Sequence, residues 1–288
     1  PPRSTLFPYT TLFRSEREEI KERVRLQLLA KTVPSQAVID MVWDVNAGRA
    51  LVFTASPKQV DLVCELFNKT FENMRLQAVS PFDRLKNLLD ADLQSGLANE
   101  NLASSDALLD LINSNAWLGQ DFLAWLLFTG LNGGRFSVGT DGALDKGMPF
   151  SAWIDTKIQL QGAGEGGPQK VVCSGSQDKY VEAKAAMNIG KNISGATVYL
   201  EHEENQWKFS LDAEYFAFRS FKCPPVKIER EGVEDASERE GAFYEKLYLI
   251  GYGSQLLDSL LIDFATARLT LSWPNIKASM LSWLDGEE

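Results

Sequence analysis

Residue types that carry out nucleophilic or proton-transfer chemistry are scarce in this chain. The only histidine, His202, lies in the acidic string EHEEN at the end of an expected strand, where we predict a solvated surface residue. Serine and cysteine nucleophiles therefore lack the imidazole base that usually activates them. We predict that the protein is not an enzyme and that it uses no cofactor and no metal.

One lysine follows a glycine in a way that resembles a phosphate-binding loop. Such a loop needs a glycine five residues before Gly190, where Ala185 stands, and a serine or threonine after Lys191, where Asn192 stands. We predict instead that a helix ends here, with Gly190 at its C-terminal cap.

Acidic residues offer one metal-dependent alternative. Asp155-Thr156-Lys157 places an acid and a lysine two positions apart on an expected strand, with Asp141 and Asp145 upstream. Metal-dependent nucleases use such residues to hold Mg²⁺ with carboxylates while the lysine steadies the attacking water. The competing interpretation is an edge strand in which charged and apolar positions alternate.

The balance of acidic and basic residues indicates which class of partner the protein could bind. A net charge of -10 at pH 7 argues at first against nucleic acid, because duplex binders usually carry a basic surface. Basic and acidic residues nearly balance over residues 16–86, however, and the excess of acids lies after them. An acidic protein can bind phosphate if its basic groups converge on one face.

Cysteine spacing and hydropathy indicate the compartment. Cys64, Cys173 and Cys223 lie far apart and form no CxxC pair, which predicts buried thiols in a reducing cytoplasm rather than disulfides or a zinc site. There is no run of eighteen apolar residues and no leader-like segment, so we expect neither membrane insertion nor secretion.

Hydrophobic periodicity predicts an α+β fold. The string TLFPYTTLFRS resembles a translated sequencing adapter, so we exclude residues 1–15 as an artefactual scar and expect that the natural protein begins upstream. The rest divides into an α+β unit (16–82), a helical connector with a core helix (83–135), a strand-rich domain (136–230) and a C-terminal helical segment (231–288).

The first unit has the order helix, hairpin, helix, strand. Residues 16–31 place apolar side chains at helical spacing, and two alternating segments around the turn at 46–49 predict a hairpin. Ser56 followed by Pro57 predicts the start of a second helix. Alternation over residues 74–79 predicts a further strand.

The later segments are organised around Trp117–Phe128, which is apolar on nearly every side and predicts a buried core helix. Leucine clusters over 83–113 predict one or two helices before it. Strands dominate from 136 to 221, and one helix is expected near 178–189.

Three helices are predicted near the C-terminus. Ser237 and Glu240 resemble a capping box that starts one helix, and a second is expected after Ser254. Pro274 opens a short last helix.

Several basic residues are candidate phosphate contacts. Lys21 and Arg25 share one face of the first helix and Lys31 follows them, whereas Lys184 and Lys191 flank the end of a helix in the strand-rich domain. The ordinary alternative is that all of these are solvated surface charges.

From about residue 18 to the end, the chain resembles the RdgC family of recombination-associated proteins. Five strings carry the resemblance through their order and spacing: IKERVRLQLLAKTVP, MVWDVNAGRALVF, WLGQDFLAWLLF, AWIDTKIQL and IGKNISGATVYLEHEENQWKFSLDAEYFAFRSFKCP. The resemblance implies an α+β protein that forms a closed homodimeric ring. Its basic hole would encircle double-stranded DNA without sequence preference and restrain RecA-type strand exchange.

The resemblance also implies roles for single residues in the first unit. Lys31 matches a family arginine that faces the hole, and Lys21 matches a lysine of the same helix. Val33 stands where enteric members have a phenylalanine at a dimer contact, and this replacement weakens what the resemblance implies about the contact.

A loop of the strand-rich domain departs from the family pattern. Gln177 lies near a Lys-Lys-Gln loop of the family, but Gly175 and Ser176 stand where the lysines would be. This leaves Lys179 and Lys184 as substitutes and implies weaker or differently placed DNA contacts.

We therefore predict a sequence-independent duplex-DNA-binding protein that is cytoplasmic, nucleoid-associated and homodimeric. The predicted DNA contacts are Lys21, Arg25, Lys31, Gln177, Lys179, Lys184 and Lys191. Two alternatives stay open: a metal-dependent nuclease that uses Asp155 and Lys157, and a non-catalytic protein-interaction scaffold.

Overall fold

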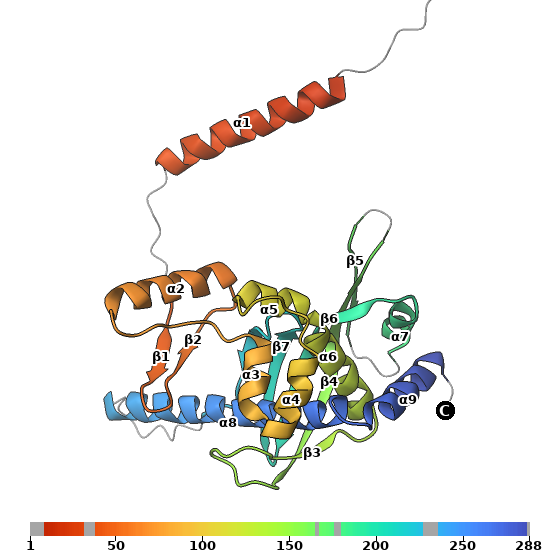
Figure 1. Cartoon of the computed structure of the whole chain (residues 1–288). Coiled ribbons are helices and arrows are strands. Elements are labelled where there is room, and N and C mark those ends of the chain that lie inside the picture. The colour runs from red at the N-terminus through yellow and green to blue at the C-terminus, as the bar shows by residue number, and fades with distance from the viewer. Residues whose placement is uncertain (1–8, 32–37, 165–166, 176–179, 227–235, 287–288) are drawn as a thin grey trace, which may run out of the picture. The chain divides into compact units, whose positions relative to one another are not determined.

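The computed structural model describes residues 9–31, 38–164, 167–175, 180–226 and 236–286 (Figure 1). It confirms the predicted α+β fold class. The chain divides into two compact units, Pro1–Thr54 and Ala55–Glu288. Residues 55–82 thus belong with the larger unit, whereas the sequence groups them with the first helix and the hairpin.

The smaller unit contains one long helix and a two-stranded hairpin. Their bounds are α1 (Tyr9–Lys31), β1 (Met41–Asp44) and β2 (Arg49–Val52). The strands are antiparallel, and the Asp44 carboxylate accepts a hydrogen bond of 2.9 Å from the Ala47 N–H in the turn. Gly48 has φ +61°, a conformation that glycine adopts without strain. The predicted hairpin is confirmed.

The larger unit combines helices with a six-stranded antiparallel sheet. The helices are α2 (Pro57–Thr70), α3 (Pro81–Leu88), α4 (Ala91–Asn99), α5 (Leu108–Ser114), α6 (Ala116–Leu131), α7 (Val181–Asn188), α8 (Ala236–Arg268) and α9 (Trp273–Asp285). The strands are β3 (Arg135–Ser137), β4 (Pro149–Gly162), β5 (Gln169–Ser174), β6 (Asn192–His202), β7 (Asn205–Asp212) and β8 (Phe218–Lys222).

The sheet has the order β3-β4-β6-β7-β8, and β5 pairs with the second half of β4. Alternate residues of the strands turn one face of the sheet toward α6 and α8. Trp207 of β7 joins this face to α8. Its indole N–H donates a hydrogen bond of 2.9 Å to the Leu249 carbonyl of α8. A Cβ atom at Gly253 of α8 would lie 2.7 Å from the Trp207 ring. The close approach of α8 to the sheet at this point therefore requires glycine.

The predicted core helix is confirmed as α6. Phe122, Leu123 and Leu126 are completely buried, and the Phe122 ring lies 5.5 Å from the ring of Phe264 on α8. A Cβ atom on Gly119 would overlap the backbone carbonyl of Ala213, just after β7. The helix is therefore buried on nearly every side, as its apolar surface requires.

The segment before α6 forms three helices rather than the predicted one or two, and capping residues explain why α3 and α4 are separate. The Ser80 hydroxyl accepts a hydrogen bond of 3.0 Å from the Asp83 N–H at the start of α3. The Asp90 carboxylate accepts one of 3.0 Å from the Leu93 N–H at the start of α4. Each cap satisfies backbone donors that begin a new helix.

The strand predicted over residues 74–79 is wrong, because this segment has no regular secondary structure. The Asn68 side chain of α2 instead accepts a hydrogen bond of 2.7 Å from the Leu76 N–H and donates one of 3.4 Å to the Leu76 carbonyl. An amide side chain thus takes the hydrogen bonds that a neighbouring strand would have made.

The two helices predicted on either side of Ser254 are one continuous helix, α8. Neither Gly251 nor Gly253 interrupts it, and Gly253 packs against Trp207. Ser237 therefore lies within the first turn of α8 rather than before it. The last predicted helix is confirmed as α9, with Pro274 in its first turn. In the part of the chain that the structure describes, no helix combines the length and the apolar character needed to cross a membrane.

Candidate nucleic-acid interface

The first candidate surface is one side of α1. Lys21, Arg25 and Lys31 are all exposed. At 3.6 residues per turn they fall within a sector of about 120° of the helix, which also contains Val24 and Leu28. Glu18, Glu19 and Glu22 fall outside this sector, with Glu18 and Glu22 nearest to Arg25. This sector of the helix therefore contains bases and no acid.

Ion pairs within α1 leave two of the three bases available. Arg25 lies 3.8 Å from Glu22, and Arg23, on the acidic side, lies 3.6 Å from Glu19. Such exposed pairs contribute little to stability and exchange readily with other anions. Lys21 and Lys31 form no ion pair within the described ranges of the chain. We call the sector that contains Lys21, Arg25 and Lys31 the basic face of α1.

The two predicted lysines near α7 are engaged within the fold. The Lys184 ammonium donates a hydrogen bond of 2.9 Å to the Trp283 carbonyl and lies 4.1 Å from the Trp283 ring centroid. Lys191 is only 7 % exposed, and its ammonium donates to the Gln169 side chain at 3.3 Å. Neither group is presented to a phosphate in this structure.

Gly190 adopts φ +85° directly after the last residues of α7, which confirms the predicted helix end. Gln177 and Lys179 lie outside the described residues, as does Val33. The candidate interface therefore rests on α1.

The acid-x-lysine motif does not assemble a metal site in the described residues. Asp155, Thr156 and Lys157 occupy a β-bulge of β4, and Thr156 has φ +62°. Asp141 lies 3.0 Å from Lys146 instead. No group of three or more His, Cys, Asp or Glu side chains in the described part of the chain has a geometry that could hold a metal ion. The edge-strand prediction is wrong, because β4 pairs with β6 on one side and with β3 and β5 on the other.

The prediction of a surface histidine is wrong. His202 is 4 % exposed, and its Nδ1 lies 3.1 Å from the Tyr252 hydroxyl of α8. The physical reason is the register of β6: Val198, Leu200 and His202 alternate onto the face that α8 covers. His202 packs in the core and does not line an exposed site.

Burial also lowers the reactivity of the three cysteine thiols. Cys173 is buried and the other two, Cys64 and Cys223, are partly buried; all three are free thiols. Burial raises the pKa of each thiol above its ordinary value, so the reactive thiolate is disfavoured.

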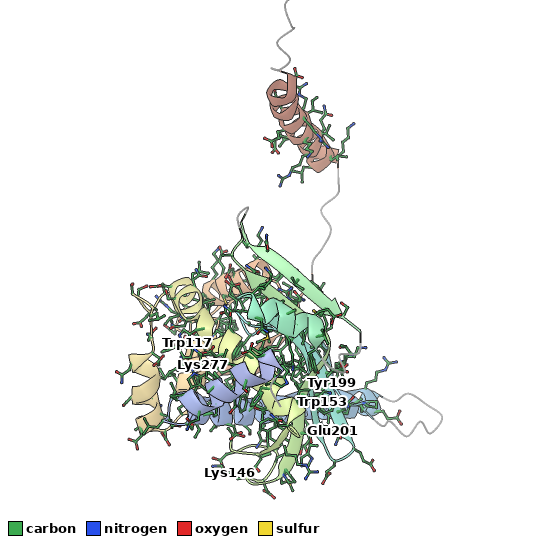
Figure 2. All side chains as sticks on the ribbon, turned by 90° about the vertical axis from the view of Figure 1, so that its right-hand side faces the viewer. Trp117, Lys146, Trp153, Tyr199, Glu201 and Lys277 are labelled. Carbon is green, nitrogen blue, oxygen red and sulfur yellow. The ribbon has the colours of Figure 1, made fainter. Side chains whose placement is uncertain are left out.

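Sequence reasoning missed a second surface, on the face of the sheet opposite α6 and α8, which we call the outer face. Four side chains of neighbouring strands lie there in one register row: Trp153 of β4, Tyr199 of β6, Lys208 of β7 and Lys222 of β8. In Figure 2, Trp153, Tyr199 and Glu201 lie together, away from Trp117 and Lys277 of the helical side. Aromatic residues at the non-core positions of Trp153 and Tyr199 are the signal in the sequence that could have found this surface.

No protein-family model matches the chain, and no curated protein matches it.

Proposed function

We propose that this protein binds double-stranded DNA without sequence preference, in the manner implied by its resemblance to the RdgC family. In this proposal the protein acts by occupancy: it covers duplex DNA as a homodimer in the nucleoid and restrains RecA-type strand exchange. No bond is made or broken.

The observation that carries the proposal is the basic face of α1. Lys21 and Lys31 are exposed cations without an ion-pair partner in the described chain, and Arg25 has only a loose one. Long, mobile cations of this kind neutralise phosphates and release the counterions that surround DNA. Phosphate contacts position a protein on the duplex but carry no sequence information, so binding should be independent of sequence.

The net charge does not contradict this proposal. The chain carries -10 overall, but no acid of α1 falls within the basic face itself, and Glu22 meets it only at its edge, where it pairs with Arg25. In a homodimer two copies of this face would act on one duplex. Doubling the number of phosphate contacts raises affinity and steepens its dependence on salt.

Charge reversal tests the proposal directly. We expect Lys21→Glu/Lys31→Glu to weaken binding of fluorescent duplexes by about tenfold or more at low salt, and equally for two unrelated sequences. The matched control is Arg23→Glu/Lys146→Glu, which changes the net charge by the same amount outside the basic face. Equal binding by both double variants would contradict a role for this face.

The alternatives predict different outcomes in the same assay. A nuclease would shorten the duplex when Mg²⁺ is added, and Asp155→Ala would abolish the cleavage. An interaction scaffold would show no binding to any duplex at low salt. Our proposal predicts an intact duplex, and inhibition of RecA-type strand exchange that is lost in Lys21→Glu/Lys31→Glu.

A further inference from the structure

The outer face of the sheet carries a row of side chains that the proposed duplex contact does not use. Strand pairing sets Trp153 opposite Tyr199 and Tyr199 opposite Lys208, and Lys208 is opposite Lys222. We call these four residues the outer row. Three of them are partly exposed and Lys222 is exposed. The row crosses four strands, a span of about 14 Å at the usual strand spacing.

The aromatic part of the outer row is ordered by its neighbours. The rings of Trp153 and Tyr199 are stacked, with centroids 5.4 Å apart and planes only 8° from parallel. The Tyr199 hydroxyl donates a hydrogen bond of 3.4 Å to the Thr156 hydroxyl, and the Lys208 ammonium lies 4.8 Å from the Tyr199 ring centroid. Tyr199 is therefore enclosed on both faces, whereas Trp153 has one ring or cation partner in the described residues.

The charges of the outer row are available to an anion. Neither Lys208 nor Lys222 forms an ion pair within the described residues. Of the acids on this face, Glu201 lies beside the row, two residues from Tyr199 on β6, and Asp212 lies farther along β7. Asp212 lies 3.8 Å from Arg219, and Glu201 accepts a hydrogen bond of 3.2 Å from Gln206.

This arrangement selects one kind of ligand by its chemistry. A flat aromatic surface beside two ammonium groups suits a chain that carries both flat rings and regularly spaced anions, which is a nucleic acid. In a duplex the faces of the bases are stacked inside the helix and cannot reach a tryptophan. In a single strand they are free, and stacking on aromatic side chains beside a basic surface is how proteins hold such strands.

We propose that the outer row is a binding site for an unpaired nucleic-acid strand, with a base stacked on Trp153 and phosphates beside Lys208 and Lys222. Tyr199 is a positioning residue, because its ring stacks on the Trp153 ring and fixes the orientation of that ring. This site lies in a different unit from the basic face of α1 and takes a different ligand, so it goes beyond the proposed duplex binding.

Binding of fluorescent oligothymidylate to the full chain tests the proposal, because this oligomer has no pairing partner. We expect Lys208→Glu/Lys222→Glu to weaken its binding by about tenfold, and Trp153→Ala to weaken it to a similar degree, since stacking of one base contributes on this scale. Trp153→Phe should keep most of the affinity because it keeps a ring. Thermal unfolding of each variant, compared with the parent chain, checks that the variant is folded.

Matched controls separate this site from general effects. Lys58→Glu/Lys146→Glu makes the same change in net charge at two exposed lysines elsewhere, and Tyr244→Ala removes an exposed ring of α8; both should bind oligothymidylate as the parent does. Lys21→Glu/Lys31→Glu should weaken duplex binding by about tenfold or more and keep oligothymidylate binding. The proposal is overturned if the parent binds duplex but not oligothymidylate, or if folded Lys208→Glu/Lys222→Glu and its control bind oligothymidylate equally.

Discussion

Asp263 shows how one residue of α8 should make stability depend on pH. Burial raises the pKa of its carboxyl from an ordinary value of 3.8 to about 6. The folded state then holds this proton to higher pH than the unfolded state. The contribution of Asp263 to stability is therefore greatest below pH 4 and is lost as the pH rises through 6.

We predict that Asp263→Asn raises the free energy of unfolding by about 1 kcal/mol at pH 8, allowing for partial exposure, and has little effect at pH 4. Urea unfolding at the two pH values measures this. Asp258→Asn is the control, because Asp258 forms an ion pair of 2.8 Å with Arg84 and its loss should destabilise the fold at pH 8. An equal gain from Asp263→Asn at both pH values would contradict the account.

Arg268 joins several helices through a single guanidinium. It donates to Asp121 of α6 at 3.0 Å and to Glu100 at 3.2 Å, and its planar group lies 4.6 Å from the Trp117 ring centroid and 5.3 Å from that of Trp273. This contact explains how α6 accommodates the carboxylate of Asp121, whose pKa burial raises despite the guanidinium.

We expect Arg268→Lys to lower the free energy of unfolding by about 1 to 2 kcal/mol, because lysine keeps the charge but not the planar fork that contacts two indole rings. Thermal unfolding against the parent chain measures the loss. Stability equal to that of the parent would show that charge alone is sufficient at this position.

Among the elements, α6 tolerates least change. Gly119 lies where a Cβ would overlap the Ala213 carbonyl, so Gly119→Ala should cost about 2 to 4 kcal/mol through displacement of the helix from the sheet. Gly251→Ala is the matched control, since a Cβ there meets nothing within 4 Å. It should stabilise α8 by about 0.5 to 1 kcal/mol. Denaturant midpoints of the two variants should move in opposite directions; movement in the same direction would contradict the packing described for α6.

The elements that the sequence predicts well are those with local signals. The apolar surface of Trp117–Phe128 and the turn at Gly48 depend on few neighbours, and the structure agrees with both predictions. The continuity of α8 could not be predicted, because it depends on Trp207 filling the space beside Gly253. Likewise, the burial of His202 depends on which face of β6 meets α8.

At the scale of the whole molecule, the two candidate sites differ in how well they can be predicted from the sequence. The basic face of α1 follows from helical spacing alone. The outer row comes from strands far apart in the sequence, and it exists only once their register is set. Conversely, Lys184 and Lys191 look like free cations in the sequence, but contacts with Trp283 and Gln169 engage them.

The salt dependence of duplex binding tests the central claim most directly. For the parent chain we predict that the logarithm of the affinity falls linearly with the logarithm of the salt concentration, as counterion release requires. In Lys21→Glu/Lys31→Glu the slope should be shallower by at least about 2, because two phosphate contacts are lost from each chain. Equal slopes for the two proteins, or no binding by the parent at low salt, would contradict phosphate occupancy by α1.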